Sequence, residues 1–223
     1  MVIFVQEQIR LTNNRMKLIE ETLLLSGELI IEGRLIDASN ATLFGYVQQE
    51  LNKQIPVVYK PIAGERPLWD FPEGTLADRE VAAFLLSKQL GLDLVPTTVL
   101  RDGPFGRGAV QQWIDIDESV DVVEYGQRNT PQIRSMALFD VIINNTDRKF
   151  GHLLIDKDGN CFGCDHGVTF HEEFKLRTVL WQFAGSPLLP EEQRVLHDAT
   201  DWLSSPSSVE LRKHLSEAEV SAL

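Results

Sequence analysis

The chain has little of what marks an exported or membrane-bound protein. Of its 223 residues only two are cysteine, Cys161 and Cys164, which is far too few for a disulfide framework and suits a reducing compartment. No apolar run approaches the length of a membrane span, and the apolar start at Met1–Val5 lacks the basic flank of a secretory signal. We therefore expect a cytoplasmic protein without integral membrane association.

Basic residues are also scarce. Lysine and arginine number 21 against 33 acidic residues, which gives a formal net charge of −12. A surface with this balance repels phosphate backbones and anionic bilayers unless a local basic patch overcomes it. Nucleic acid is therefore a poor candidate for a partner, and an anionic lipid is disfavoured. Hydrophobic residues make up 43% of the chain, enough to bury a core as one domain or two closely joined lobes.

Residues 1–114 are expected to form a first lobe built on strands. Strand-type runs of β-branched and apolar residues cover 28–36, 42–48, 55–59, 94–100 and 109–113. The first three runs predict an antiparallel meander. Helices are predicted at 13–25 and 76–90, each followed by a glycine, and a loop rich in proline and glycine at 64–74.

Residues 115–223 are expected to form a mainly helical second lobe. An acidic connector at 115–124 marks the boundary. A helix at 132–144 is apolar around nearly its whole circumference, so it should be buried. A β-hairpin is predicted over 153–164, where a Lys-Asp-Gly turn separates two short strands. The remainder has a helical pattern.

Two aspartates lie where phosphoryl transfer needs carboxylates. Asp147 follows the buried helix on a loop, where it can orient or accept the proton of an incoming hydroxyl. Asp165 ends a strand and precedes His166-Gly167, where a tight turn can aim its carboxylate at a divalent cation. Each alone could be a turn residue that bonds nearby backbone. Together, with a hairpin between them, they are typical of a kinase.

Lys60 and Glu80 form a second candidate pair. Lys60 ends an apolar strand, so its ammonium could contact nucleotide phosphates, and Glu80 on the next helix could hold that ammonium in position. The same residues could instead be a surface lysine and a glutamate on a helix face. Their place upstream of Asp147 favours the nucleotide-binding interpretation.

Three short motifs surround the two aspartates: Asn145-Thr146-Asp147-Arg148, Leu153-Leu154-Ile155 and Asp165-His166-Gly167-Val168-Thr169-Phe170. They resemble the corresponding segments of the phosphatidylinositol 3-/4-kinase-like proteins, in particular the type II phosphatidylinositol 4-kinases and the HipA-like bacterial kinases. Further likeness to small bacterial proteins labelled as phosphatidylinositol kinases lies in Val58–Pro61, Gly64–Pro72 and Arg79-Glu80. The resemblance covers roughly residues 27–175. It implies an α+β, two-lobed protein-kinase-like fold, with a small antiparallel sheet lobe and a small, mainly helical lobe.

The resemblance also implies a role for each matching position. The nucleotide-binding positions are Ser39, Asn40 and Thr42 in a phosphate-covering hairpin, Lys60 and Glu80 at the phosphates, and Gln111, Gln112, Trp113 and Ile114 around the adenine. Asp147 and Lys60 would be catalytic, and Asp165 and His152 would be the metal positions. The hairpin residues could instead form a plain β-turn, and Trp113 could belong to the core.

His152 departs from the pattern of those kinases, which carry asparagine five residues after the catalytic aspartate. Imidazole is a poor ligand for Mg²⁺ and suits Mn²⁺ or softer metals better. Three outcomes are open: a kinase that tolerates Mn²⁺, a kinase with a single metal on Asp165, or a nucleotide binder that has lost catalysis. We expect retained activity because the other positions are intact.

The expected function is therefore that of an ATP-dependent kinase that uses Mg²⁺ or Mn²⁺. The acceptor could be a protein serine or threonine, a small alcohol or phosphatidylinositol, but no basic amphipathic helix offers a way to reach a bilayer. The alternatives are a catalytically inactive nucleotide-binding regulator and a nucleotidyl transferase on the same fold. The oligomeric state is open.

Several neighbouring residues have less specific signals. Cys161-x-x-Cys164 near two histidines suggests zinc, but a structural zinc site needs four converging ligands. Arg148 could contact phosphate or brace its loop, and Asp140 is expected to bond loop backbone. The loop at 69–71 could cover the site or pack beneath it.

Overall fold

The computed structural model describes residues 18–35, 40–48 and 54–223. These residues belong to two compact units. Unit 1 combines the described residues up to Arg66 with Thr97–Trp113, and unit 2 combines Pro67–Pro96 with Ile114–Leu223. Each unit buries an apolar core of its own.

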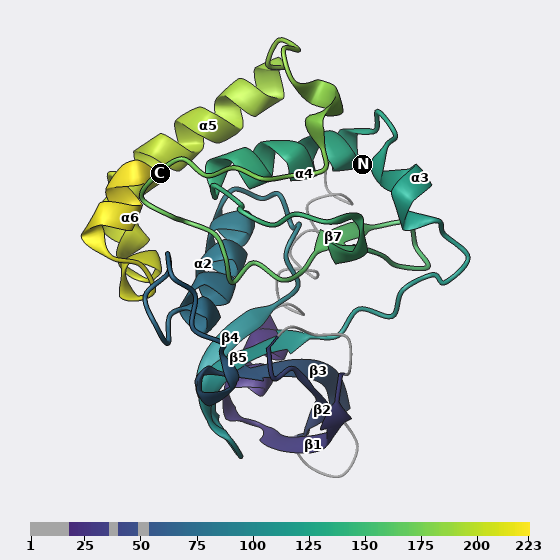
Figure 1. Cartoon of the computed structure of the whole chain (residues 1–223), viewed down its shortest axis with the longest axis vertical. Coiled ribbons are helices and arrows are strands. Elements are labelled where there is room, and N and C mark those ends of the chain that lie inside the picture. Colours follow the sequence, from purple (N-terminus) through teal and green to yellow (C-terminus); the bar gives the residue numbers. More distant parts are fainter. Residues whose placement is uncertain (1–17, 36–39, 49–53) are drawn as a thin grey trace, which may run out of the picture. The chain divides into compact units, whose positions relative to one another are not determined.

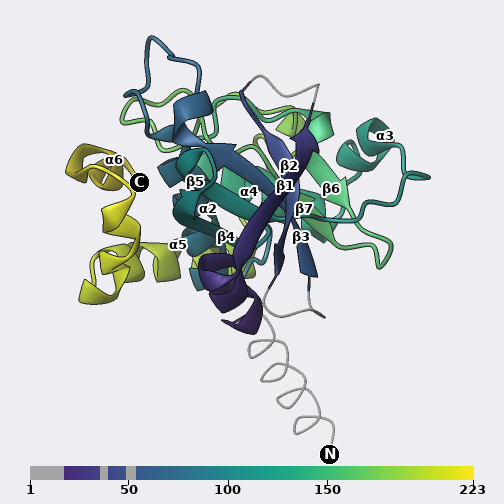
Figure 2. The same ribbon diagram turned by 90° about the horizontal axis from the view of Figure 1, so that it is seen from below.

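Unit 1 is built on a five-stranded antiparallel sheet with the strand order β1-β2-β3-β5-β4, which can be followed in Figure 1; Figure 2 shows the same strands from below, with β1 in front. Its strands are β1 (Glu28–Arg34), β2 (Leu43–Gln48), β3 (Gln54–Pro61), β4 (Thr98–Gly103) and β5 (Gly106–Gln112). Alternate residues of β3, Ile55, Val57 and Tyr59, are buried in the core because successive side chains of a strand point to opposite faces. The predicted meander of the first three strands is confirmed.

A helical stretch at 18–26 packs Leu23 and Leu24 into the same core. It corresponds to the helix predicted at 13–25, of which residues 13–17 lie outside the described residues.

The last hairpin of the sheet differs from its prediction at both strand starts. β5 begins at Gly106 rather than at residue 109, because Gly106 adopts φ +94° and lets a tight turn close against Gly103. β4 begins at Thr98 rather than at residue 94. The preceding Leu94 and Val95 are buried in the core of unit 2, where the Leu94 carbonyl accepts from the Gly163 N–H at 2.7 Å.

Unit 2 is mainly helical. Its α-helices are α2 (Leu76–Gln89), α3 (Val122–Gly126), α4 (Pro131–Ile142), α5 (Pro190–Leu203) and α6 (Glu217–Ala222), and its hairpin consists of β6 (Leu153–Ile155) and β7 (Cys161–Gly163). The 3₁₀ turns along the chain are η1 (Ile62–Gly64), η2 (Phe150–His152), η3 (Trp181–Phe183), η4 (Pro206–Val209) and η5 (Leu211–Lys213). Figure 1 shows α5 alongside α4, and the ion pair between Arg134 and Glu192 joins the two helices.

The start of α4 follows the local chemistry of its sequence. Thr130 caps the helix, with its side chain accepting from the Ile133 N–H, and Pro131 occupies the first turn. The predicted hairpin over 153–164 is also confirmed. Within the described ranges, no helix is both long and apolar enough to cross a membrane.

Helix α2 belongs to unit 2, although the sequence assigned it to a first lobe that ends at residue 114. Its buried side chains explain the difference. Ala83 and Leu86 of α2 share one core with Met136 and Phe139 of α4, so the helix is part of the apolar interior of the second unit rather than of the sheet.

The segment 165–189, which was predicted to be helical, is largely irregular. Part of its backbone bonds the loop after α4. The Arg148 N–H donates to the Arg177 carbonyl at 3.0 Å, and the Arg177 N–H donates to the Asn145 carbonyl at 2.8 Å. These long-range bonds satisfy the backbone groups that a helix would have used. Helices return in α5 and α6, as predicted.

Candidate functional site

Asp147 lies in the loop that follows α4, which we call the catalytic loop (residues 145–149). Its backbone N–H donates to Asn145 Oδ1 at 3.0 Å. Its carboxylate accepts from Lys149 Nζ at 2.6 Å, and its side chain is 31% exposed. One bond thus holds the backbone of Asp147 and another holds its carboxylate, which stays partly open to solvent.

Asp165 and His152, the two predicted metal positions, lie together. Asp165 adopts φ +60° and so turns the chain sharply after β7. The His152 carbonyl accepts from the Cys164 N–H at 3.0 Å, which fixes the two short segments side by side. His152 Nε2 is 3.7 Å from Asp165 Oδ2, beyond normal hydrogen-bond length.

The donor set of this pair fits a divalent metal of intermediate softness. Burial lowers the pKa of His152, and the nearby Asp165 opposes this only in part, so the imidazole is neutral at pH 7. Its Nδ1 is buried without a hydrogen bond among the described residues. One imidazole nitrogen and one exposed carboxylate suit Mn²⁺ better than Mg²⁺.

The protein would supply only part of such a coordination shell. In the described ranges, no group of three or more histidine, cysteine, aspartate or glutamate residues is placed to hold a metal. At Asp165 and His152, phosphate and water oxygens would have to complete the shell.

We expect His152 to make folding stability depend on pH. Because its pKa is lower in the folded than in the unfolded chain, the unfolded state takes up a proton first as the pH falls below about 6.5. Stability is therefore lost on acidification. Urea unfolding at about pH 7.5 and about pH 5.5 should show a smaller loss in His152→Asn than in the unchanged protein.

His197 provides the matched control, because its Nε2 also lies 3.7 Å from a carboxylate, that of Asp201, but its side chain is 75% exposed. His197→Asn should leave the pH dependence as it is. An equal effect of both substitutions would contradict the role assigned to burial.

A buried ion pair supports the loops that carry both aspartates. Asp140 of α4 accepts from Arg148 Nη2 at 2.8 Å, and both side chains are fully buried. The Asp140 carboxylate also accepts from Asn145 Nδ2 and Thr178 Oγ1, each at 2.9 Å. Burial alone would lower the pKa of Arg148, but Asp140 raises it overall, so the guanidinium stays charged.

Arg148 also reaches the residue after Asp165. Its Nη2 lies 2.8 Å from His166 Nε2, which must accept because a guanidinium has no acceptor atom. Arg148 is therefore a brace of its loop, one of the two roles that the sequence left open. The Asp140 carboxylate accepts from the side chains of Arg148, Asn145 and Thr178, which corrects the expectation that it bonds loop backbone.

Helix α2 holds the segment 165–170, which we call the metal loop. Glu80 is 2% exposed, and its Oε2 accepts from the His166 N–H at 3.1 Å. Arg79 Nη1 donates to the Thr169 carbonyl at 2.7 Å, and its guanidinium pairs with Glu219 of α6. Sequence reasoning missed both contacts. The role of Glu80 as a partner of Lys60 stays a prediction.

The predicted phosphate-binding positions of unit 1 lie at one end of the sheet. Leu43 of β2 pairs with Tyr59 of β3, so Thr42 comes beside Lys60 in this register. Asn40 Oδ1 accepts from the Arg66 N–H at 2.9 Å, which ties the start of the described segment 40–48 to residue 66. Ser39 lies outside the described residues.

Because side chains alternate along a strand, the other predicted nucleotide-binding residues of the sheet lie on two different faces. Lys60 points away from the face on which Val57 is buried, because their positions alternate. Gln111 pairs with Val58 and therefore shares the face of Lys60, whereas Gln112 pairs with Val57 and lies on the other face. The side chain of Gln112 is therefore not on the face of Lys60, and its backbone N–H donates to the Thr97 carbonyl at 2.8 Å.

Trp113 makes an aromatic contact that the sequence did not predict. Its ring meets Phe44 edge to face, with centroids 5.1 Å apart, while 36% of the residue stays exposed. The two rings offer an apolar surface of the kind a nucleotide base contacts. Ile114 is half-buried at the first position of the second segment of unit 2.

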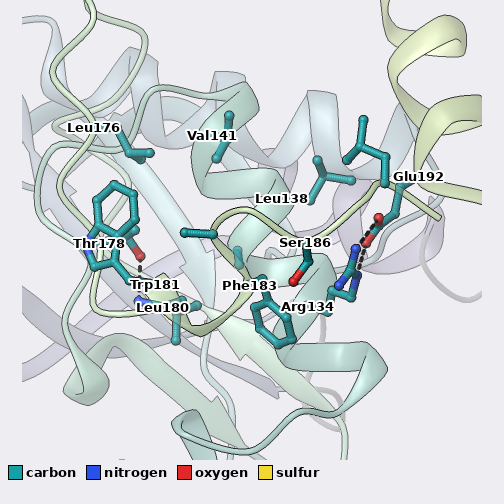
Figure 3. Close-up of a pocket in the computed structure, with 13 residues that line it drawn as sticks. Arg134, Leu138, Val141, Leu176, Thr178, Leu180, Trp181, Phe183, Ser186 and Glu192 are labelled. Carbon is teal, nitrogen blue, oxygen red and sulfur yellow. Dashed lines mark hydrogen bonds and ion pairs between the residues drawn. The ribbon is translucent and has the colours of Figure 1, made fainter.

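A pocket of about 150 Å³ lies elsewhere in unit 2. Figure 3 shows its lining, in which apolar side chains such as Val141 and Leu176 surround the space and the Arg134–Glu192 pair borders it. None of the predicted site residues lines this pocket, so we do not assign the candidate site to it. Thr178 connects the pocket wall to Asp140.

The comparisons with known proteins begin with a negative result, because no family model matches the chain. Protein Rv2133c of Mycobacterium tuberculosis is 40% identical over 239 aligned positions, which cover 92% of this chain and 86% of that protein. Phosphatidylinositol 4-kinase gamma 4 of Oryza sativa subsp. japonica is 30% identical over 143 positions, which cover 53% of this chain and 25% of that protein.

Among solved structures, that of hydra Fam20 with sugar matches with a TM-score of 0.59 and 15% identity, over 90% of this chain and 83% of that one. Identity this low shows the fold alone. Together with the rice kinase, this neighbour fits a kinase-like fold for the small antiparallel sheet and the helices described above. Since the match to Rv2133c spans most of both proteins, the chain belongs to the family of Mycobacterium tuberculosis protein Rv2133c.

Proposed function

We propose that this protein transfers the γ-phosphoryl group of ATP to a hydroxyl acceptor. The observation that carries the proposal is the common support of two carboxylate loops within unit 2. The Asp140–Arg148 pair bonds Asn145 beside Asp147 and His166 beside Asp165. A support that positions one carboxylate for a hydroxyl and another for a cation matches the needs of phosphoryl transfer.

Asp147 would act on the acceptor. Its carboxylate would orient the hydroxyl and receive its proton as the new bond to phosphorus forms. Lys149 would hold the carboxylate, and Asn145 Oδ1, which accepts from the Asp147 backbone N–H, would hold the loop that carries it. Such positioning accounts for much of the catalysis in reactions of this class.

The residues of unit 1 would bind the nucleotide. Lys60 would contact the phosphates, and the backbone at Asn40–Thr42 would approach them from the neighbouring turn. The apolar contact between Phe44 and Trp113 supports a place for the adenine. Asp165 and His152 would hold a divalent metal, which when bound neutralises phosphate charge.

A nucleotide-binding regulator without turnover is the second candidate. His152 favours it, because the imidazole stands where the resembling kinases carry a metal-binding asparagine. A protein of this kind would bind ATP through the same residues and would transfer nothing.

Metal preference tests the proposal. With ATP labelled at the γ-phosphate, we expect Mn²⁺ to support ATP hydrolysis and self-labelling about tenfold better than an equal concentration of Mg²⁺. His152→Asn should lower the ratio of the activity with Mn²⁺ to the activity with Mg²⁺, because an amide oxygen is a harder ligand than imidazole. His197→Asn, on the exposed face of α5, should leave the ratio unchanged.

The same assay separates the alternatives. ATP binding without hydrolysis or labelling under either metal would support the regulator. Labelling from ATP marked at the α-phosphate would instead indicate nucleotidyl transfer.

A further inference from the structure

Two aromatic side chains of unit 2 stand out in solvent. Trp69 is 92% exposed and Phe174 is 78% exposed, which makes them the most exposed large apolar residues in the part of the chain that the structure describes. A single exposed apolar residue is ordinary. Two such aromatic residues on adjoining loops are typical of an interaction surface.

The loops that carry these rings are fixed to each other. We call residues 68–71 and 171–175 the aromatic loop pair. His171 Nε2 lies 2.9 Å from the Asp70 carbonyl, and Lys175 Nζ lies 3.3 Å from Asp70 Oδ2. Phe71 packs edge to face on His171, and Lys175 Nζ stands 5.0 Å from the centre of the Trp69 ring. Binding to loops already held in place loses less conformational entropy.

The aromatic loop pair is also tied to the catalytic loop. Asn144, which adopts φ +48° just before that loop, donates from Nδ2 to the carbonyls of His171 and Glu173. Its Oδ1 accepts from the Lys175 N–H at 2.9 Å. In the chain, residues 171–175 follow the metal loop directly. A ligand held by these loops therefore lies close to the segments that carry Asp147 and Asp165.

The charge around the rings is negative. Segments 68–73 and 171–177 contain four carboxylates, those of Asp70, Glu73, Glu172 and Glu173, and two cations, Lys175 and Arg177. Lys175 is itself paired with Asp70 and Glu173. Within a chain of net charge −12, this surface repels anionic lipid headgroups and attracts cationic groups.

We propose that the aromatic loop pair binds a basic polypeptide segment that presents an apolar side chain to Trp69 and Phe174. Resting on the proposed function, this identifies the acceptor as a serine or threonine of that segment. The hydroxyl oxygen forms the new bond to the γ-phosphorus while the bond from that phosphorus to ADP breaks, and the hydroxyl proton passes to Asp147.

The test measures binding without ATP. The probe is a short fluorescent peptide with a central serine, flanking leucines and terminal arginines, and its counterpart carries glutamate in place of each arginine. We expect the basic peptide to bind at least about tenfold more tightly. Trp69→Ala should weaken its binding about tenfold or more, whereas Trp181→Ala, which removes a ring that is 55% exposed and lines the pocket bordered by the Arg134–Glu192 pair, should not.

A charge pair of variants tests the electrostatic part. Glu172→Lys should weaken binding of the basic peptide, and Asp198→Lys, the same charge change on the exposed face of α5, should have a much smaller effect. Equal binding of both peptides, equal effects of the two tryptophan variants, or tighter binding to phosphatidylserine vesicles would each overturn the inference.

Adding labelled ATP separates this inference from the proposed function. A peptide that binds in the expected way but receives no phosphate supports the docking surface and contradicts the kinase proposal. Phosphorylation of a different acceptor by a protein that does not bind the peptide overturns the docking surface and supports the kinase proposal.

Discussion

Asp147→Asn is expected to lower the rate of phosphoryl transfer about a thousandfold and to leave ATP affinity nearly unchanged. Asparagine has the same shape and can keep the bond from the Asn145 side chain to its backbone N–H, but its amide cannot take the hydroxyl proton. Initial rates with labelled ATP and calorimetric titration of ATP would measure the two quantities separately.

The chain offers a matched control for this change. Asp115 accepts from Lys157 Nζ at 2.7 Å, almost the same contact that Asp147 makes with Lys149, and Asp115→Asn should not alter the rate. Asp165→Ala should act differently from Asp147→Asn, because it should abolish the dependence of ATP binding on metal. An Asp147→Asn protein of nearly full activity would refute the role of that carboxylate.

Asp140→Asn is expected to lower the free energy of unfolding by about 3–5 kcal/mol, the usual cost of leaving a buried charge without its partner. Arg148 would keep its charge in a fully buried position. The new amide would also direct donor hydrogens toward groups that now donate to Asp140, namely Asn145 Nδ2 and Thr178 Oγ1. Urea unfolding measures the change.

Two comparisons show whether the burial of the Asp140–Arg148 pair causes the expected loss of stability. Glu124→Gln removes a pair of similar length to Arg128, but those side chains are 69% and 51% exposed, so the loss should stay below about 1 kcal/mol. Asp140→Leu combined with Arg148→Met should recover part of the stability of Asp140→Asn, because no charge is then left unpaired. A loss in Asp140→Asn no larger than in Glu124→Gln would contradict the assignment.

Much of the fold could be predicted where the determinants are local. The cap at Thr130, the proline after it and the turn before Asn160 each act within a few residues, so their elements lie where the sequence placed them. The predicted start of β4 was wrong because it is determined by contacts with distant segments. Leu94 and Val95 look like strand residues, but their apolar side chains are buried in the core of unit 2, which no local pattern reveals.

The candidate site likewise combines residues that the sequence pointed to with contacts that it did not reveal. The spacing of Asp147 and Asp165 predicted the two carboxylate loops, the resemblance added His152, and the structure brings His152 and Asp165 together. The Asp140–Arg148 pair and the contact of Glu80 with His166 depend on how distant segments fold back. Sequence patterns carry no direct record of such contacts.

The two aromatic residues of the loop at 69–71 differ sharply in their exposure to solvent. Phe71 is 6% exposed and lies under the Arg79 guanidinium, which is 4.8 Å from the ring centre, whereas Trp69 is 92% exposed. The sequence left covering and packing open for both residues. Trp69 lies in a tight turn that is closed by a bridge between Leu68 and Phe71, so one ring packs at the base of the turn while the other faces solvent.

The left-handed backbone conformation of Asp165 limits which residues can replace it. Aspartate, asparagine and glycine adopt φ +60° readily, while other side chains cost about 1–2 kcal/mol there. Of the two easy replacements, one is uncharged and the other has no side chain, so a single tolerated change at this codon would remove the carboxylate that we propose as a metal ligand from a protein that still folds.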